Sequence, residues 1–492
     1  MDAAAAGVKD RVRSHWLFAI VIAAFVILSH AAFFRLPYYW DELGQFIPAA
    51  LDIFQHGAWI PRSTVPNVHP PGVMAYLAGV WSLTGYSIAA TRVAMLALGA
   101  AGAVITLRLG MVMGLPSGAA KLATAWLSIS PLFFAQSMMA LLDMPAMVFF
   151  SLALLLFLED RIIAAALAST ALVLAKETGL VVPAMLAAWL WFEGRRREAL
   201  WFLLPIPPLI IWLMSLDRST GHLFGNAAFT QYNVWYPLHP VRLGLALVRR
   251  LYYLFLGSGH WIGTIAVLLA LRNTKLFRIR AWCIPGSLIA AHVVFVSVLG
   301  GAVLERYLVP VLPLLYIGFA AAMWQYTALW RMGTAGALAA ALIAANLINP
   351  PYPFPMENNL AFADFVRLHV DAAQYLEAHF PQATISTMFP LSSALRRPEF
   401  GYVQHSLHIR EIYDFRAANM APLARENVEV VVLYSVAWDP WGLMQNKRWT
   451  AFLQRFYEYE PPVDAAQMGV LLNAHSVARW TRHGQWIEIY QR

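Results

Sequence analysis

The sequence predicts a polytopic α-helical membrane protein of about eleven transmembrane helices, followed by a soluble α/β domain. The first observation is composition: 60% of the 492 residues are apolar and 13% are charged, whereas soluble domains carry about 25% charged residues. A soluble protein could not bury so much apolar surface. The second is that apolar residues recur in many blocks, which excludes a single-span receptor and a disordered chain. The third is a change of pattern after residue 349, where short apolar runs alternate as in soluble α/β domains.

The first apolar block, at 16–34, lacks the small-residue cleavage site of a signal peptide, so we expect it to remain as a transmembrane helix. Further spans are expected at 87–112, 118–133, 144–158, 162–175, 180–193, 200–215, 250–271, 281–299, 307–327 and 333–349. Several of these blocks are shorter than the roughly 20 residues of a straight span. We therefore expect some helices to be tilted or extended by polar flanks.

Lysine and arginine residues in the short loops predict the orientation. One side of the membrane receives Lys9, Arg11, Arg13, Lys121, Arg161, Arg195, Arg196, Arg197, Arg272, Lys275, Arg278 and Arg280. The positive-inside rule makes this side cytoplasmic, and eleven spans place the C-terminal region on the opposite side. We expect a protein of the cell (inner) membrane with a cytoplasmic N-terminus and a periplasmic or otherwise extracytoplasmic C-terminal domain.

These basic loops account for the net charge of +8. No Lys/Arg-rich stretch is interleaved with aromatic residues, so the lipid bilayer is an expected partner and nucleic acid is not. The single cysteine, Cys283, excludes a disulfide framework and a multi-cysteine metal site.

The transmembrane domain is predicted to cover 1–349 and the extracytoplasmic α/β domain 350–492, with a stiff, proline-rich linker at 349–355. The spacing of apolar residues in the second domain predicts helices at 360–379 and 444–458. Short β-branched or alternating runs predict its strands, at 383–388, 428–436, 468–473 and 485–490.

The first outer loop, at 35–86, is too long for a simple connector. It places Asp41 and Glu42 immediately before an amphipathic helix over 43–54, which we expect to lie on the membrane surface. A second short helix should start at His69-Pro70-Pro71-Gly72, with proline in its first turn. Asp41 is then either a functional carboxylate or only a helix N-cap.

The later outer loops add further candidates, each with a plain alternative. Asp143 precedes a span and is either functional or a helix cap. Lys176 and Glu177 form either a self-paired turn or a functional pair between two short spans. Arg306, beside Tyr307, binds a ligand or extends to the membrane interface. The fourth outer loop is polar enough to bind substrate but has no specific motif; it carries Asp217, Arg218, His222, His239, Arg242, Arg249 and Arg250.

The argument for function rests on convergence. On the predicted topology one face collects Asp41, Glu42, His69, Asp143, Lys176, Glu177 and Arg306. Carboxylates can accept a proton or orient a hydroxyl, and lysine and arginine can hold a phosphate. This combination at an outer membrane surface predicts transfer of a group that is carried on a lipid phosphate.

The same residues carry a resemblance to the family 39 glycosyltransferases, the bacterial relatives of the dolichyl-phosphate-mannose protein mannosyltransferases, which have the GT-C membrane fold. The matching features are Trp40-Asp41-Glu42, His69-Pro70-Pro71, Asp143-Met144-Pro145, Lys176-Glu177-Thr178-Gly179, and Arg306-Tyr307 followed by Pro310 and Pro313. The resemblance covers roughly 16–350. His69 departs from the lysine that some aminoarabinose transferases of lipid A have at this position.

The resemblance implies a polyprenyl-phosphate sugar donor, an acceptor hydroxyl on a protein, lipid or glycan, and inversion at the anomeric carbon. We assign Asp41 as general base, and Glu42 and Asp143 as residues that orient the acceptor or the base. Arg306 is the first choice for the leaving phosphate and Lys176 the second. His69, Glu177 and Tyr307 complete the expected substrate-binding set.

Two other classes of function stay open. A transporter or flippase of lipid-linked sugars would carry charges near the bilayer midplane and often two related halves, and the sequence has no matching halves. A structural membrane scaffold leaves the outer carboxylates without a role. We expect no cofactor and no dedicated metal, because a monophosphate-linked donor lacks the diphosphate that commonly recruits Mg²⁺ and fixed cations can neutralise its charge.

Overall fold

The chain folds into two compact units in a computed structural model that describes residues 2–350, 356–437, 439 and 441–492. One unit consists of Met1–Ala32 and Ala49–Asn346, and the other of Phe33–Pro48 and Leu347–Arg492. The second unit therefore includes a piece of the long first loop, which the sequence assigns to the transmembrane domain. Most of the predicted proline-rich linker, at 351–355, lies outside the described residues.

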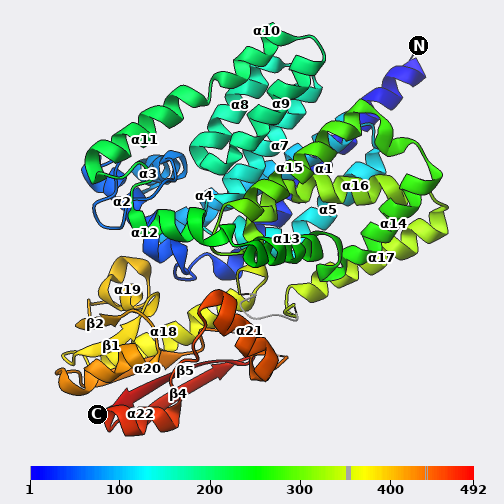
Figure 1. The fold of residues 1–492 in the computed structure, drawn as a ribbon. Helices are drawn as coiled ribbons and strands as arrows, with labels where there is room; N and C mark the ends of the chain where they lie inside the picture. Colours follow the sequence, from blue (N-terminus) through cyan, green and yellow to red (C-terminus); the bar gives the residue numbers. More distant parts are fainter. Residues whose placement is uncertain (1, 351–355, 438, 440) are drawn as a thin grey trace. The chain divides into compact units, whose positions relative to one another are not determined.

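The first unit is built from helices (Figure 1). Its helices of ten or more residues are α1 (Asp2–Leu28), α2 (Ile47–His56), α3 (Gly72–Thr84), α4 (Ile88–Val112), α5 (Ser117–Ile129), α7 (Asp143–Leu158), α8 (Ile162–Ala175), α9 (Val181–Phe192), α11 (Ile206–Thr220), α13 (Pro240–Phe255), α14 (His260–Asn273), α15 (Arg280–Val298), α16 (Leu312–Met323) and α17 (Ala328–Ala345). Shorter helices are α6 (Pro131–Ser137), α10 (Arg196–Ala199) and α12 (Ala227–Thr230). Most of these helices lie within a few residues of the predicted apolar blocks, but the block at 250–271 covers the end of α13, the break after it and most of α14.

Within the described residues, six helical stretches are long and apolar enough to cross a membrane, or seven if the bent pair α13 and α14 forms one span. The further apolar helical stretches are shorter: Gly72–Thr84, Asp143–Leu158, Ile162–Ala175 and Glu177–Phe192. The chain is thus a multi-pass membrane protein, whereas the number of eleven spans stays a prediction. The shorter helices stay candidates for spans, because backbone that is buried in protein at membrane depth does not have to form one unbroken helix.

Helix α7 lies at the centre of the helical unit, and almost all of its side chains are buried. It packs against α4, α8 and the 3-10 helix η9 (Glu305–Val311). This packing brings the first residue of α7, Asp143, to the residues at the start of η9. It also brings Asp143 to the 3-10 helix η3 (Glu177–Leu180), which follows α8.

Helix α3 begins at Gly72, directly after the predicted His69-Pro70-Pro71 start signal. A glycine is required here because a Cβ atom would lie 2.4 Å from the carbonyl oxygen of Leu174, far inside van der Waals contact. Leu174 stands two residues before Lys176. The start of α3 therefore sets the position of the backbone that carries a predicted site residue.

We expect Gly72→Ala to destabilise the protein by about 1–3 kcal/mol, the usual cost of overpacking a tight contact. The clash is with backbone, which cannot rotate away as a side chain can. Thermal unfolding of the purified protein measures the effect. Gly79→Ala on the same helix is the matched control, because no atom lies within 4 Å of its added Cβ. This change should be neutral or slightly stabilising. Equal melting temperatures for the two variants would refute the role of Gly72.

The second unit contains a five-stranded sheet in the order β2-β1-β3-β5-β4. The strands are β1 (Ile385–Met388), β2 (Ile409–Ile412), β3 (Val430–Tyr434), β4 (His475–Arg482) and β5 (Gln485–Gln491). Strand β1 is parallel to both β2 and β3, and β5 is antiparallel to both β3 and β4. The helices are α18 (Ala361–His379), α19 (Leu391–Arg396), α20 (Ala417–Met420), α21 (Lys447–Tyr457) and α22 (Ala465–Leu472). Helix α18 packs on β4 and β5.

The predicted strand at 468–473 is wrong, because these residues belong mainly to helix α22. A capping box causes the difference: the side chain of Asp464 accepts from the backbone of Gln467, and the side chain of Gln467 accepts from the backbone of Asp464. The strand of this region is β4, which lies further along the chain. It turns into β5 through His483 and Gly484, both with positive φ, as tight hairpins require.

The segment Phe33–Pro48 is anchored in the second unit by aromatic residues. The hydroxyl of Tyr402 donates to the carbonyl oxygen of Tyr38 at 2.6 Å. The ring of Tyr39 packs against Phe362 and Phe365, with centroids 5.7 and 5.5 Å apart. The predicted amphipathic helix follows, first as a π-helical turn over Glu42–Phe46 and then as α2.

Candidate active site

The centre of the candidate site is an ion pair between Asp143 and Lys176. The Nζ of Lys176 lies 2.6 Å from Oδ1 of Asp143, and the two residues are only 8% and 2% exposed. No side chain caps the start of α7, so Asp143 does not act as the helix cap that the sequence left open. Lys176 pairs with Asp143 and not with its neighbour Glu177, which excludes the self-paired turn. Burying such a pair is expensive in free energy, which makes it a candidate for function.

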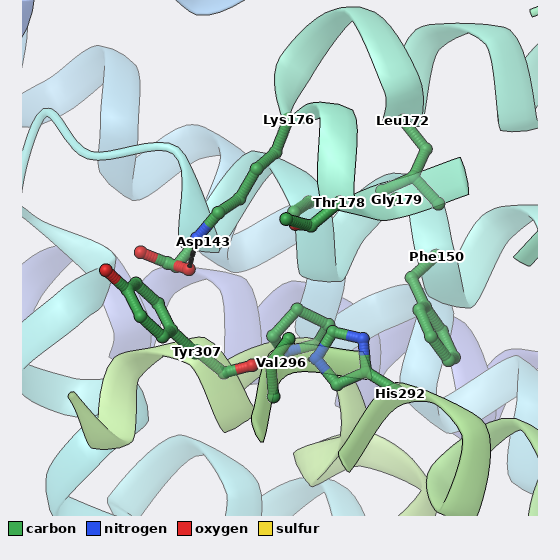
Figure 2. A pocket seen from close by; sticks show the side chains of 11 residues that line it. Asp143, Phe150, Leu172, Lys176, Thr178, Gly179, His292, Val296 and Tyr307 are labelled. Atoms are coloured by element: carbon green, nitrogen blue, oxygen red, sulfur yellow. Dashed lines mark hydrogen bonds and ion pairs between the residues drawn. The ribbon is translucent and has the colours of Figure 1, made fainter. Parts of the chain in front are cut away.

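Tyr307 is the residue around which further cations gather. The Nζ of Lys176 lies 4.2 Å from the centroid of its ring, as Figure 2 illustrates, and Cζ of Arg306 lies 5.8 Å from it. Nε of Arg306 is also 3.5 Å from Oδ2 of Asp143. The guanidinium of Arg306 is therefore held within the unit, at 5% exposure, and does not extend to an interface as a lone arginine would.

Arg250 is a third cation at this place. Its Cζ lies 6.0 Å from the centroid of the Tyr307 ring, and the residue is 1% exposed. Within the described part of the chain, none of its three guanidinium nitrogens has a hydrogen-bond partner. A buried guanidinium without partners is costly. This cost is offset when an anionic ligand supplies the missing acceptors.

The charges in this cluster do not balance. Lys176, Arg250 and Arg306 contribute three positive charges, and Asp143 contributes one negative charge. The neighbouring Arg249 and Glu305 form their own ion pair, with Nη2 and Oε2 3.1 Å apart, and add no net charge. The cluster therefore suits a ligand with one or two negative charges, such as a phosphate ester.

A narrow pocket lies next to this cluster. Its lining residues are Asp143, Ala146, Phe150, Leu172, Lys176, Thr178, Gly179, His292, Val296, Tyr307 and Pro310. Figure 2 shows Asp143, Lys176 and Tyr307 together, with His292 and Phe150 further along the lining. A ring nitrogen of His292 lies 2.7 Å from the carbonyl oxygen of Tyr307, which holds the start of η9 in place. The charged atoms of Asp143 and Lys176 thus lie beside a lining that is otherwise largely apolar.

His69 and Glu177 form a second polar pair. Nδ1 of His69 lies 2.8 Å from Oε2 of Glu177, and both side chains are mostly buried. The indole nitrogen of Trp212 donates to the carbonyl oxygen of Val68 at 2.9 Å, which fixes the loop beside His69. The pair ties the loop before α3 to the turn that carries Lys176, so its direct effect is to position that turn.

Asp41 and Glu42 lie in the other compact unit and differ in what they do there. Glu42 is fully buried, and its Oε2 accepts a hydrogen bond from the backbone N–H of Tyr39 at 2.8 Å. This bond stabilises the turn at Trp40, whose φ of 45° is rare for a non-glycine residue. Asp41 occupies the N-cap position, but its side chain makes no capping hydrogen bond.

The structure thus brings together six of the predicted site residues in two adjoining groups within the helical unit. Sequence reasoning named Arg250 only as one residue of the polar fourth outer loop and left His292 out, although His292 is an ionisable residue in an apolar helix and such residues are functional candidates. Among the described residues, no group of three or more His, Cys, Asp or Glu side chains is arranged to hold a metal ion. The expectation of metal-independent chemistry stays a prediction.

Comparison with solved structures identifies the fold. The chain is similar to ArnT from Cupriavidus metallidurans bound to undecaprenyl phosphate, with a TM-score of 0.56, 15% identity and 98% of each chain covered. The apo state of that protein gives a TM-score of 0.57 at 14% identity, with the same coverage. The archaeal oligosaccharyltransferase AglB from Archaeoglobus fulgidus, in complex with an inhibitory peptide and a dolichol-phosphate, gives 0.51 at 9% identity, with 97% of this chain and 74% of that chain covered.

The chain has the GT-C fold. No protein-family model and no curated protein sequence matches it. The likeness to ArnT extends over nearly the whole of both chains, including the C-terminal unit. At these identities the likeness concerns the fold, and the activity of the chain has to be argued from its own residues.

Proposed function

We propose that the chain is a membrane glycosyltransferase that moves a sugar from a polyprenyl-phosphate donor to an acceptor hydroxyl on the outer face of the membrane. The observation that carries the proposal is the buried cluster of Lys176, Arg250 and Arg306 around Tyr307, which has a net positive charge. Within the described residues the guanidinium nitrogens of Arg250 have no hydrogen-bond partner. The GT-C fold supports it, since a protein of this fold has been seen with undecaprenyl phosphate bound. The cell inner membrane is the proposed location, with the C-terminal domain outside the cytoplasm.

In the proposed reaction the acceptor oxygen attacks the anomeric carbon while the bond from that carbon to the phosphate oxygen breaks. The electron pair of the broken bond leaves with the polyprenyl phosphate, whose negative charge develops beside the cation cluster. Preorganised cations that face a developing charge stabilise the transition state. Displacement from the opposite side of the sugar inverts the anomeric configuration.

The acceptor hydroxyl loses its proton in the same step, and we assign Asp41 as the base that takes it. Asp41 is favoured over Glu42 because the carboxylate of Glu42 is engaged with the backbone of Tyr39. Asp143 is assigned to orienting Lys176 and Arg306, since it contacts both. The acceptor is a protein, a lipid or a glycan. The identity of the sugar and of the acceptor is a question for analysis of the cell envelope.

The test of this function uses purified protein in vesicles with a radiolabelled polyprenyl-phosphate sugar and a crude acceptor fraction. Transfer releases free polyprenyl phosphate and moves the label to the acceptor. A flippase would return the donor intact, and that result would overturn the proposal. Deletion of the gene, followed by mass spectrometry of the envelope glycoconjugates, then identifies the sugar and the acceptor by what is missing.

Arg306 provides a specific prediction. Arg306→Lys keeps the charge but loses the planar fork that binds two phosphate oxygens, so turnover should fall, and Arg306→Ala should lower it further. A loss of roughly 10²-fold is expected for the alanine variant, as for removal of one preorganised donor. Initial rates at saturating and at limiting donor measure both turnover and affinity.

The control for Arg306 is Arg108→Ala, which removes an exposed partner of Glu159. Exposed ion pairs contribute about 0–1 kcal/mol, so this variant should behave like the native protein. Unchanged donor affinity and turnover in both Arg306 variants would mean that Arg306 has only a structural role.

A further inference from the structure

Helix α21 of the second unit is an amphipathic helix of which no residue is buried. Trp449, Phe452, Leu453 and Phe456 recur at three- and four-residue spacing and therefore share one face. The rings of Trp449 and Phe452 stack, with centroids 5.5 Å apart, and Phe452 and Phe456 are 4.9 Å apart. An apolar stripe of this kind normally faces a core, yet here it remains partly exposed.

The helix is well formed on its own. The side chain of Asn446 accepts from the backbone N–H groups of Arg448 and Trp449 and so caps the N-terminus. Glu458, in the left-handed conformation, ends the helix. Trp441, in the segment just before the helix, is 67% exposed and adds another large aromatic side chain to this region.

The charges on α21 are all positive. Lys447, Arg448 and Arg455 carry three positive charges, and the helix contains no acidic residue. On a helical projection these residues lie outside the aromatic stripe, on the polar side and at its border. A basic polar face opposite a face of aromatic and leucine residues is the pattern of helices that lie in the interface of an anionic membrane.

The chain connects the second unit directly to two candidate transmembrane helices. One candidate span, His15–Phe33, ends at the residue where the second unit begins. Another, Ala328–Ala345, ends two residues before Leu347, where the unit resumes. The unit is therefore joined covalently at two places to candidate transmembrane helices, so binding of α21 to the same bilayer would be an intramolecular event with a high effective concentration.

We propose that α21 is an interfacial membrane anchor that binds the anionic lipid surface of the bilayer the chain spans. The aromatic stripe inserts at the boundary of headgroups and acyl chains, and the three cations contact lipid phosphates. The anchor fixes the soluble unit at the membrane surface in addition to its covalent tethers. It does not depend on the proposed sugar transfer, because it concerns a helix outside the candidate active site.

The test is site-specific fluorescence of the full-length protein in vesicles. Cys283, the one cysteine of the sequence, is first replaced by serine. A single cysteine is then introduced by Phe456→Cys on the aromatic stripe or by Gln454→Cys on the opposite face, and is labelled with an environment-sensitive dye. The vesicles contain phosphatidylglycerol and phosphatidylcholine, or phosphatidylcholine alone, and carry spin-labelled lipids as quenchers. Iodide serves as the quencher from water.

We expect lipid quenching to be roughly threefold stronger at position 456 than at 454, as for a helix whose apolar face enters the interface. This difference in lipid quenching between positions 456 and 454 should decrease in vesicles without phosphatidylglycerol. It should also decrease in a variant that combines Lys447→Gln, Arg448→Gln and Arg455→Gln. A label at 456 that iodide quenches as well as at 454 would overturn the proposal, since the face would then be in water. Protection from both quenchers would overturn it too, because protein and not lipid would cover the face. Leu453→Cys repeats the test if Phe456→Cys lowers the yield.

Discussion

Replacing Asp41 by asparagine should abolish most sugar transfer while leaving the protein folded. General base catalysis contributes about 10²–10⁴-fold, and an amide cannot accept the proton that the acceptor hydroxyl must lose. Folding should survive because asparagine has nearly the same shape as aspartate and keeps a side-chain oxygen at the N-cap position. Turnover of a polyprenyl-phosphate sugar by the purified variant, with its melting temperature measured in parallel, tests the assignment.

Glu42→Gln is the matched control, because it removes the neighbouring carboxylate but keeps an oxygen that can accept from the backbone N–H of Tyr39. We expect this variant to retain much more activity than Asp41→Asn. The opposite order would move the role of base to Glu42. Near-normal turnover by a well-expressed Asp41→Asn protein would exclude Asp41 altogether.

The helical part of the fold could be predicted from the sequence because its signal is local. Apolar runs and their polar junctions place helices such as α4, α8 and α15 to within a few residues. The same junctions pointed to Asp143 and Lys176, whose charges stand out beside apolar helices. Which of these charges pair with one another depends on packing between α7, α8 and η9, and no local pattern contains that information.

The second unit shows where local reasoning fails. The place of Tyr38 and Tyr39 in its core depends on contacts with residues more than 300 positions away, such as Tyr402 and Phe362. Strand β4 was missed because none of its residues is buried, half of them are exposed, and its side chains are largely polar. The sequence does contain the signal of the capping box, an Asp at position 464 followed three residues later by Gln467. This signal predicts a helix where a strand was predicted.

Arg250 was not assigned to the site for a related reason. It follows Arg249 in an amphipathic helix, and adjacent residues point about 100° apart on a helix. One guanidinium therefore pairs with Glu305 while the other is buried beside Tyr307. Composition alone cannot tell which of two neighbouring arginines is buried.

The burial of Arg250 leads to the second prediction with a large effect: its replacement should weaken donor binding without lowering the stability of the fold. Arg250→Met replaces a buried guanidinium without hydrogen-bond partners by an unbranched apolar side chain. Removing an uncompensated buried charge should leave the melting temperature of the ligand-free protein unchanged or raise it. Donor binding should weaken markedly, since a hydrogen bond to a charged group contributes about 1.5–3 kcal/mol, or roughly 10–100-fold in affinity.

The measurement is thermal unfolding with and without undecaprenyl phosphate. A ligand that binds only the folded state raises the melting temperature of the native protein, and this shift should largely disappear in Arg250→Met. The contrasting variant is Arg92→Met, which removes another buried guanidinium whose Nη1 donates to the carbonyl oxygen of Met138 at 2.9 Å. Loss of that bond leaves a buried acceptor unsatisfied, so Arg92→Met should lower the melting temperature of the ligand-free protein. If Arg250→Met is destabilised to the same extent and still responds fully to undecaprenyl phosphate, Arg250 supports the fold and does not bind the phosphate.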